Sequence, residues 1–267
     1  MMEFKKDFFA NYLKFAPVSL ALERSLECEI YSKQVFEHPV LDLGCGDGLF
    51  AFILFDDKVD TGIDPNPREV KRATQYAIYS EQINCLGDKI RKPDGSYETI
   101  YSNSVLEHIP DLEPVLKEVH RLLSAGGNFY VTVPTHLFQT YTVGSRFLTA
   151  LGLSRLAIKY ERFYNSFWSQ IHCYTPAVWS DLFERNRFKV VNVIEYGSKK
   201  TSLIYGLFIP LAFWGWLIKK LFNRWTLVPT WRKICTWPIY TIIRRGFFID
   251  AIGISKGGLV FIKLVKT

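Results

Sequence analysis

The nine residues from Val40 to Gly48 constrain the fold of this chain more than any other stretch. They read VLDLGCGDG, a short apolar run followed by glycines at positions 44, 46 and 48. An apolar run of this length that ends in glycine is typical of a buried strand. Glycine also permits tight turns and a close approach of a ligand to the backbone. The pattern therefore predicts the first strand of an α/β sheet, ending in a loop that holds a nucleoside.

A second predicted strand, VDTGID, ends in Asp64, sixteen residues after Gly48. At the carboxyl end of a strand, this carboxylate would lie within reach of ribose hydroxyls, so two strand ends flank one crevice. One alternative is a nicotinamide dinucleotide site, which typically spaces its glycines as GxGxxG to cradle a pyrophosphate. The spacing here is GxGxG. A degenerate fold that binds no nucleotide is the other alternative.

With these residues in view, the chain resembles class I S-adenosylmethionine-dependent methyltransferases with a type 11-like methyltransferase core. The shared marks are the glycine loop, the LGD of Asp88, the stretch SNSVLEHI and an AGG turn, and they cover roughly His38 to Pro134. One departure is Ala125, where the family usually has proline. The resemblance implies a Rossmann-like, doubly wound, mostly parallel seven-stranded α/β sheet. It also implies helical insertions after the fifth strand and between the last two strands, with the final strand antiparallel.

The resemblance further implies S-adenosyl-L-methionine as the cofactor and assigns residues to it. The glycine loop would lie under the methionine part, Asp64 would bind the ribose, and Asp88 would approach the adenine amino group. Asp42 either reaches the methionine ammonium or ends the strand, and His108 either shapes the pocket or orders a turn. The complete predicted set is Asp42, Gly44, Cys45, Gly46, Asp47, Gly48, Asp64, Pro65, Asp88, Asn103, Ser104 and His108, with no metal ligand.

Alternating strand and helix patterns organise the rest of the chain and favour a parallel sheet. Helices are expected from Pro17 onward, over PREVKRATQYAIY (67–79), and after Asp111 as N-cap, with Gly126 closing the last of these. With 267 residues and 48% hydrophobic content, one domain with insertions is expected. We predict four segments: an N-terminal helical cap (1–37), the cofactor-binding core (38–134), a substrate cap insertion (135–175), and a C-terminal part of the core (176–267) with a further insertion at about 197–255.

That further insertion has an unusual composition. Thr201 to Ile218 is uncharged and bounded by lysine pairs, and five of the seven tryptophans lie between positions 214 and 237. About twenty apolar residues are needed to cross a bilayer, so a run of eighteen with a proline inside is borderline. Tryptophan beside lysine and arginine is typical of a membrane interface. We expect a monotopic or re-entrant anchor on an anionic membrane surface, and the alternative is a buried helical hairpin or homodimer interface.

Charge and cysteine content indicate the kind of partner and the cellular compartment. The net charge is +7, and nine basic residues with no acidic ones lie between Tyr196 and Ile249. Nucleic-acid binding would also use such cations, but the long aliphatic runs argue against it. The five cysteines are odd in number and form no metal motif, which indicates a reducing compartment without structural zinc. The N-terminal residues resemble no signal peptide. A cytoplasmic protein, peripheral or monotopic at the inner face of the membrane, is expected.

Methyl transfer from a sulfonium needs a base only when the acceptor must lose a proton. His172 and His136 are the predicted bases, because both should fall near the carboxyl edge of the sheet and imidazole titrates near neutrality. Histidines in loops are also often structural. Tyr164, Trp168 and Tyr174 are candidates to line an acceptor pocket, although packing roles are equally expected.

Three functions remain open from the sequence. The first is a methyltransferase that acts on a membrane-borne or lipid-linked acceptor, such as a glycolipid, a polyprenyl-linked sugar or a quinone. The second is a methyltransferase of a soluble small molecule, with the hydrophobic insertion as a dimer surface. The third is a non-catalytic cofactor-binding module that assists a membrane enzyme.

Overall fold

A seven-stranded sheet forms the centre of the computed structural model, which describes residues 1–248 and 251–267. The strand order is β3-β2-β1-β4-β5-β7-β6, and β7 runs antiparallel to both of its neighbours while the other pairs are parallel. The predicted fold class is confirmed. The strands are β1 (Val40–Leu43), β2 (Val59–Asp64), β3 (Tyr79–Asn84), β4 (Tyr97–Asn103), β5 (Leu123–Pro134), β6 (Phe188–Tyr196) and β7 (Leu259–Lys266).

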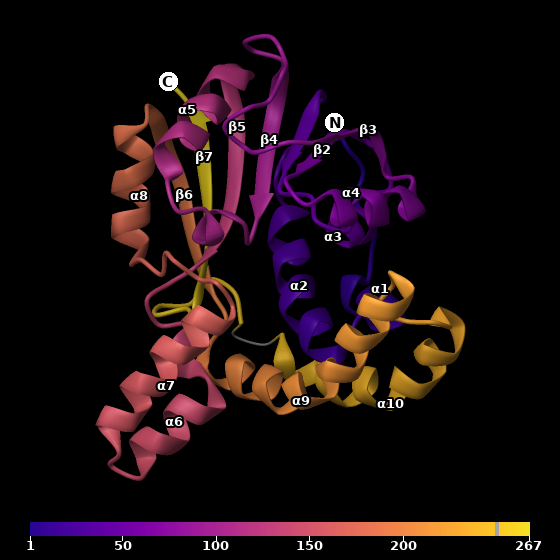
Figure 1. Ribbon diagram of the computed structural model, residues 1–267, viewed down its shortest axis with the longest axis vertical. Helices are drawn as coiled ribbons and strands as arrows, with labels where there is room; N and C mark the ends of the chain where they lie inside the picture. The colour runs from indigo at the N-terminus through magenta and orange to yellow at the C-terminus, as the bar shows by residue number, and fades with distance from the viewer. Residues whose placement is uncertain (249–250) are drawn as a thin grey trace.

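Ten α-helices lie in the described residues, around the sheet and at one end of it (Figure 1). Apolar residues at three- and four-residue spacing form the buried faces of these helices. α5, for example, buries five such side chains and begins after the N-cap Asp111. The helices are α1 (Phe8–Phe15), α2 (Val18–Tyr31), α3 (Leu49–Leu54), α4 (Pro67–Ala73), α5 (Leu112–Leu122), α6 (Val143–Ala150), α7 (Ser154–Phe167), α8 (Pro176–Arg185), α9 (Lys199–Phe222) and α10 (Pro229–Phe247), with 3-10 turns η1 (Thr74–Tyr76), η2 (Leu106–His108) and η3 (Gln139–Tyr141).

Two hydrophobic cores flank the sheet. One lies under α1, α2 and α3 and is rich in aromatic side chains, including Tyr31, Phe36 and Tyr101. The other lies under α5 and α8 and contains Trp179 and Phe183, both fully buried. Because both faces are covered, neighbouring residues of one strand enter opposite cores; in β4, Ile100 lies in the second core and Tyr101 in the first.

Two predicted boundaries are wrong. The helix expected over 67–79 ends at Ala73 and passes through η1, and β3 already begins at Tyr79; Ala77 has a left-handed φ of 49°, which stops the helical path. Gly126 does not close α5, which ends at Leu122. It lies instead in an irregularity of β5, where pairing with β4 shifts, and its φ of 77° favours glycine.

The predicted insertion between the last two strands contains the two longest helices. α9 packs against α2, and α10 packs against α1, so the insertion covers the N-terminal helices rather than the sheet. Pro210 and Pro238 lie inside these helices. Figure 1 places α6, α7, α9 and α10 together at the end of the molecule that the carboxyl ends of the parallel strands face. Residues 249 and 250, which belong to the predicted range 197–255, lie outside the described residues.

Candidate functional site

The glycine loop after β1 adopts the conformation that its sequence predicts. Gly44 and Gly46 have φ values of 83° and 51°, which disfavour other residues. The N–H groups of Gly44 and Cys45 donate to the carbonyl of Ile63, which joins the loop to β2. A Cβ added at Gly46 would meet no atom within 4 Å, so this part of the loop faces open space. The loop can therefore cradle a ligand against its backbone.

Asp64, at the tip of β2, is oriented by backbone donors. Its two carboxylate oxygens accept from Gly46 N at 3.1 Å and from Asn66 N at 2.8 Å. Burial raises the pKa of this carboxyl, and the two backbone hydrogen bonds oppose that shift. The contact to Gly46 joins the two strand ends that the sequence predicts to flank one crevice.

A cavity of about 750 Å³ lies at these strand ends. Gly48 is absent from its walls; it precedes α3, where an added Cβ would lie 2.9 Å from Ala73 Cβ, so it allows a close helix approach instead. The other eleven of the twelve predicted cofactor residues line the cavity, and their contact with the cofactor stays a prediction: Asp42, Gly44, Cys45, Gly46, Asp47, Asp64, Pro65, Asp88, Asn103, Ser104 and His108.

Asp42 lies at the floor of this cavity and is almost fully buried. Its Oδ2 accepts hydrogen bonds from the hydroxyls of Tyr79 at 2.7 Å and Tyr101 at 2.6 Å. Burial raises the pKa of Asp42 to about 7, although both tyrosine hydroxyls stabilise the carboxylate. Asp42 thus titrates near neutrality, and its second oxygen, Oδ1, makes no hydrogen bond to the described residues.

An arginine from α2 fixes the tip of β4. Arg24 donates through Nη1 to Glu27 at 2.6 Å, to Asn103 Oδ1 at 2.9 Å and to Ser104 Oγ at 2.6 Å. Asn103 in turn donates to Glu27 and to Thr132, so its side chain has one orientation. The sequence analysis missed Arg24 and Glu27. No local signal marks them, because both lie off the apolar stripe that Val18, Leu22 and Leu26 form on this helix.

The two histidines predicted as bases do not line the cavity at the strand ends. Both ring nitrogens of His172 are engaged, Nδ1 with the hydroxyl of Tyr174 at 2.8 Å and Nε2 with the carbonyl of Ile109 at 2.9 Å. His136 is exposed after β5, and its N–H donates to the carbonyl of Tyr174. Their catalytic role stays a prediction, and these contacts favour a structural role.

A buried carboxyl group beside His108 was also missed. Glu107, in η2, is 2% exposed, and burial raises its pKa to about 8. Its Oε2 has no hydrogen-bond partner among the described residues. Its carbonyl accepts from the N–H groups of Ile171 and His172, so it joins the end of the predicted substrate cap to the loop after β4.

The insertion contributes to the cofactor cavity, which the sequence did not predict. Lys219 and Trp225, at the end of α9 and in the connection to α10, are both in the cavity walls. Lys219 Nζ lies 2.7 Å from Asp47 Oδ2, and Trp225 Nε1 donates to the same oxygen at 2.8 Å. No sequence motif marks a contact between residues so far apart in the chain.

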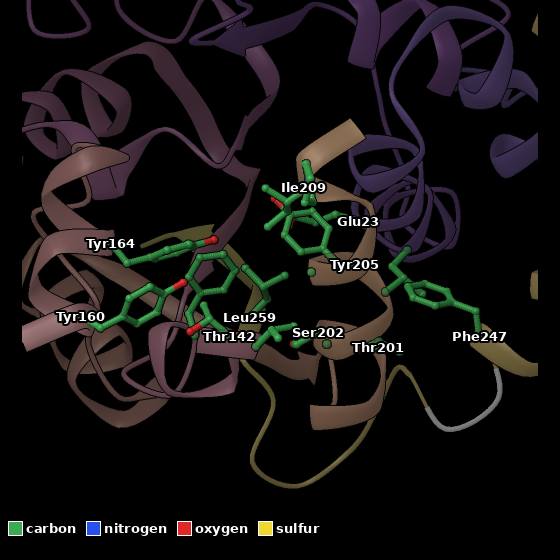
Figure 2. A pocket seen from close by; sticks show the side chains of 16 residues that line it. Glu23, Thr142, Tyr160, Tyr164, Thr201, Ser202, Tyr205, Ile209, Phe247 and Leu259 are labelled. Atoms are coloured by element: carbon green, nitrogen blue, oxygen red, sulfur yellow. The ribbon is translucent and has the colours of Figure 1, made fainter. Parts of the chain in front are cut away.

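A second cavity of about 260 Å³ lies between α2, the cap helices and α9 (Figure 2). Among the described residues, Glu23 is the only charged one in its lining. Burial raises the pKa of Glu23 to about 7, while Arg24 lowers it. Tyr164 lines this cavity, and its contact with an acceptor stays a prediction, whereas Trp168 and Tyr174 line neither cavity. The walls are Glu23, Leu26, Phe138, Thr142, Val143, Tyr160, Tyr164, Gly197, Thr201, Ser202, Tyr205, Gly206, Ile209, Pro210, Phe247 and Leu259.

The two cavities are neighbours across one turn of α2. Glu23 faces the second cavity, and the next residue, Arg24, lines the first and binds Asn103 and Ser104 in its wall. Glu27 completes this partition, since it binds Arg24 on one side and the hydroxyl of Tyr196 on the other at 2.9 Å. One site therefore suits a nucleoside and the other a largely apolar molecule with a polar group.

The first cavity fits S-adenosylmethionine. A carboxylate at the β2 tip suits ribose hydroxyls, and the open face of Gly46 leaves room where a side chain would intrude. Carboxyl groups outnumber basic groups in the walls, which suits a ligand with a positively charged sulfonium. The residues that would hold the cofactor are those of the glycine loop, Asp64 and Asp88.

Known proteins that this chain resembles include methyltransferases. A sterol 24-C-methyltransferase of Aspergillus fumigatus is 38% identical over 100 residues, 34% of this chain and 26% of that enzyme. A ubiquinone biosynthesis O-methyltransferase of Xanthomonas oryzae is 27% identical over 121 residues, 42% of this chain and 51% of that enzyme. The matched part thus spans a quarter to a half of these relatives. A solved S-adenosylmethionine-dependent methyltransferase from Thermotoga maritima shares the fold, with a TM-score of 0.59, 15% identity and coverage of 94% and 92% of the two chains.

The family comparison covers most of the chain. Residues 10–193 match the model of a methyltransferase domain. This range contains the glycine loop, the tip of β2 and the network around Arg24. The chain therefore belongs to the methyltransferase domain family, and it shares the fold of a solved S-adenosylmethionine-dependent methyltransferase.

Proposed function

We propose that this enzyme methylates a membrane-associated or lipid-borne acceptor whose reacting end is an uncharged hydroxyl group or an amine. The second cavity is the observation that carries this proposal. Its walls come from α2, from the cap helices α6 and α7, and from the apolar helix α9, so one cavity joins the catalytic core to the most hydrophobic part of the chain (Figure 2).

The charge of this cavity selects among acceptors. The described part of its lining contains the carboxyl group of Glu23 and no lysine, arginine or histidine. A phosphate or carboxylate would be desolvated there beside a like charge and without a cation, which is unfavourable. Hydroxyl groups of Tyr160, Tyr164 and Tyr205 offer hydrogen bonds to a neutral polar group. Neutral lipids are therefore favoured over polyprenyl phosphates.

The outer surface of the same end supports a membrane acceptor. By length and composition, α9 is the described helix that could cross a membrane, and 11% of its most apolar window is buried. Many large apolar side chains are exposed on the cap and the insertion, among them Phe147, Phe163, Phe167, Leu207, Leu211, Phe213, Trp214, Trp231, Ile234, Trp237 and Ile242. Exposed apolar surface of this extent is typical of membrane or protein contacts.

The names of two relatives point the same way. A sterol and a ubiquinone precursor are hydrophobic acceptors, and the enzymes that bear these names match 34% and 42% of this chain. Because the match spans only 26% and 51% of those enzymes, the acceptor of this chain is inferred from its own cavity.

The chain's contribution to the reaction is mostly positioning. The cofactor supplies a methyl group already activated on a sulfonium. The glycine loop and Asp64 hold the cofactor in the first cavity, and the second cavity holds the apolar body of the acceptor, whose reacting end must reach past the Arg24–Glu27 network to the sulfonium methyl. The buried helices exclude water. Glu23, with a pKa of about 7, is a carboxyl group that could accept the proton of an acceptor hydroxyl near neutral pH.

The test is the fate of a labelled methyl group. Purified enzyme is incubated with methyl-labelled S-adenosylmethionine and, separately, with total membrane lipid and with the soluble metabolite fraction. We expect label in the organic phase. A Ser202→Phe variant, which fills the second cavity, should lose at least tenfold in transfer but still bind S-adenosylhomocysteine, whereas the exposed control Ser154→Phe should retain both.

Two outcomes would contradict the proposal. Label in the aqueous fraction alone, with a stable dimer in solution, would identify a soluble acceptor and an insertion that serves as a dimer interface. Cofactor binding without transfer to either fraction, together with stimulation of a separate membrane enzyme, would identify a non-catalytic module.

A further inference from the structure

The end of α9 and the start of its connection to α10 reach back to the cofactor loop. We call residues 219–225 the α9–α10 turn. Lys219 Nζ lies 2.7 Å from Asp47 Oδ2 and 3.1 Å from Glu69 Oε2, so it contacts the glycine loop after β1 and the helix after β2 together. Trp225 adds a hydrogen bond to Asp47, and the Lys219 ammonium lies 4.6 Å from the centre of the Trp225 ring.

A second set of contacts holds the turn to α4. Arg72 Nε donates to Asn223 Oδ1 at 3.1 Å, and Arg72 Nη2 lies 3.5 Å from the carbonyl of Lys219. Asn223 ends α9 in a left-handed conformation with a φ of 59°, which asparagine tolerates well. The turn is therefore fixed at two places on the cofactor-binding core and has a defined shape of its own.

The charges in this contact are partly desolvated. The side chains of Lys219 and Asp47 are 15% and 14% exposed. Burial alone would raise the pKa of Asp47, but the ammonium of Lys219 and the indole N–H outweigh it, so the pKa lies below its ordinary value. Removal of one partner from a desolvated ion pair leaves the other uncompensated, which is costly. Asp47 would then be expected to move towards solvent and take the glycine loop with it.

The turn lies outside the part of the chain that matches the family. The match ends at residue 193, and the turn belongs to the insertion that follows. Both Lys219 and Trp225 nevertheless line the cofactor cavity. We propose that the α9–α10 turn is a part of the cofactor site, in which Lys219 and Trp225 position the glycine loop through Asp47 and so set the affinity for the cofactor. This inference needs the cofactor but neither the acceptor nor the membrane of the proposed function.

Binding of S-adenosylhomocysteine to the full-length protein tests the inference by isothermal titration calorimetry, without lipid or acceptor. Lys219→Met keeps the aliphatic stem and removes the charge, and we expect about tenfold weaker binding, within the usual range of coupling between sites. Trp225→Phe keeps a ring and removes the N–H donor, and should weaken binding in the same direction. The matched control is Lys220→Met, because Lys220 is the exposed neighbour that contacts Trp216 and not the cavity.

Hydrogen exchange tests the inference on the wild-type protein, so the result does not depend on how a substitution affects folding. By reciprocity, a ligand whose affinity depends on the turn must also stabilise the turn. Amide exchange in residues 219–226 should therefore slow when S-adenosylhomocysteine is added. If Lys219→Met and Trp225→Phe bind as tightly as the control, or if exchange in this segment is unchanged by the ligand, the turn is not part of the site.

Discussion

The carboxylates at the tips of β1 and β2 show how neighbouring residues of one type acquire different properties. Asp42 is buried under two tyrosine hydroxyls, and its pKa is raised to about 7. Asp64 is half-buried and accepts two backbone N–H groups. Asp42 can orient a ligand, and its own charge changes near neutral pH. Asp64 presents a hydrogen-bond acceptor in a fixed orientation to ribose hydroxyls.

Asp64→Asn should weaken S-adenosylhomocysteine binding by about 10- to 100-fold, because an amide cannot accept at both positions where the carboxylate now does and hydrogen bonds to charged groups contribute about 1.5–3 kcal/mol. Calorimetry measures the change. The control is Asp56→Asn, at an exposed residue outside the cavity. Unchanged affinity in the Asp64 variant would remove Asp64 from the cofactor site.

Glu23 predicts a pH dependence of stability. The folded protein retains the proton up to about pH 7, whereas an unfolded chain releases it near pH 4.3. The folded state therefore binds more protons in this window, and stability falls as pH rises through it, by on the order of 3 kcal/mol. Glu23→Gln should be more stable than wild type at pH 8 and equal to it near pH 4.

Urea unfolding at the two pH values measures this difference. The exposed substitution Glu184→Gln, on α8, serves as the control and should show no such dependence relative to wild type. Equal stability of wild type and Glu23→Gln at pH 8 would show that Glu23 is charged without penalty in the folded protein.

At the scale of elements, α9 depends on a close approach to the N-terminal part of α2. Gly215 is buried on α9, and a Cβ added there would lie 2.5 Å from the ring of Pro17. Because a proline ring cannot move aside by a rotamer change, any side chain at this position must push the helices apart. The α9–α10 turn begins one helical turn further along the same helix.

Gly215→Ala should thus weaken cofactor binding severalfold, although the residue lies outside the cavity. Calorimetry with S-adenosylhomocysteine again measures the effect. Gly246→Ala is the matched control, since a Cβ at this position of α10 meets no atom within 4 Å. Equal affinity of the two variants would mean that the docking of α9 does not reach the cofactor.

The strands and most helices of the core could be predicted from the sequence because their signals are local. Strand β1 and its glycines, the Asp111 cap and the apolar period of α5 each lie within about a dozen residues. The end of α4 was predicted too late because the left-handed Ala77 carries no glycine to mark it. Whether an insertion docks on the core cannot be read in this way, because the contact of Asp47 with Trp225 joins residues 178 positions apart.

The residues of the candidate site also divide into those that the sequence places and those that depend on contacts between distant parts of the chain. Residues at strand ends, such as Asp64 and Asn103, could be placed because parallel strands bring their carboxyl ends to one edge. The two histidines were predicted from the chemistry of imidazole and from an expected place at the carboxyl edge of the sheet, and the structure gives His172 two hydrogen-bond partners away from the cavity. Glu23 could not be chosen because its raised pKa results from burial against elements distant in the sequence.

At the scale of the whole molecule, hydrophobic and basic residues gather at one end. The cap helices and the insertion expose large apolar side chains, and the sheet with its covering helices lies at the other end (Figure 1). Exposed basic residues of the insertion, such as Lys200, Arg224 and Lys233, add an electrostatic attraction to anionic lipid. This uneven distribution of apolar and basic residues over the molecule supports the proposed membrane contact.

Exposed positions on α9 allow a direct test of that contact. Leu211 and Trp214 are 61% and 64% exposed, and their replacement by glutamate removes apolar contacts of about 1.5–3 kcal/mol each. Leu211→Glu/Trp214→Glu should lose cosedimentation with phosphatidylglycerol-containing vesicles and still bind S-adenosylhomocysteine. Val191→Glu, at an exposed position of β6, is the control. Sedimentation equal to that of wild type would exclude this face of α9 from the membrane contact.

The position of Lys219 and Trp225 in the cavity wall leads us to expect an effect on turnover. Spent cofactor that leaves past this wall must first displace the end of α9, so the frequency of that local opening would limit how often a new methyl donor can enter. A bilayer that immobilised α9 would then slow cofactor exchange even while it brought the acceptor closer.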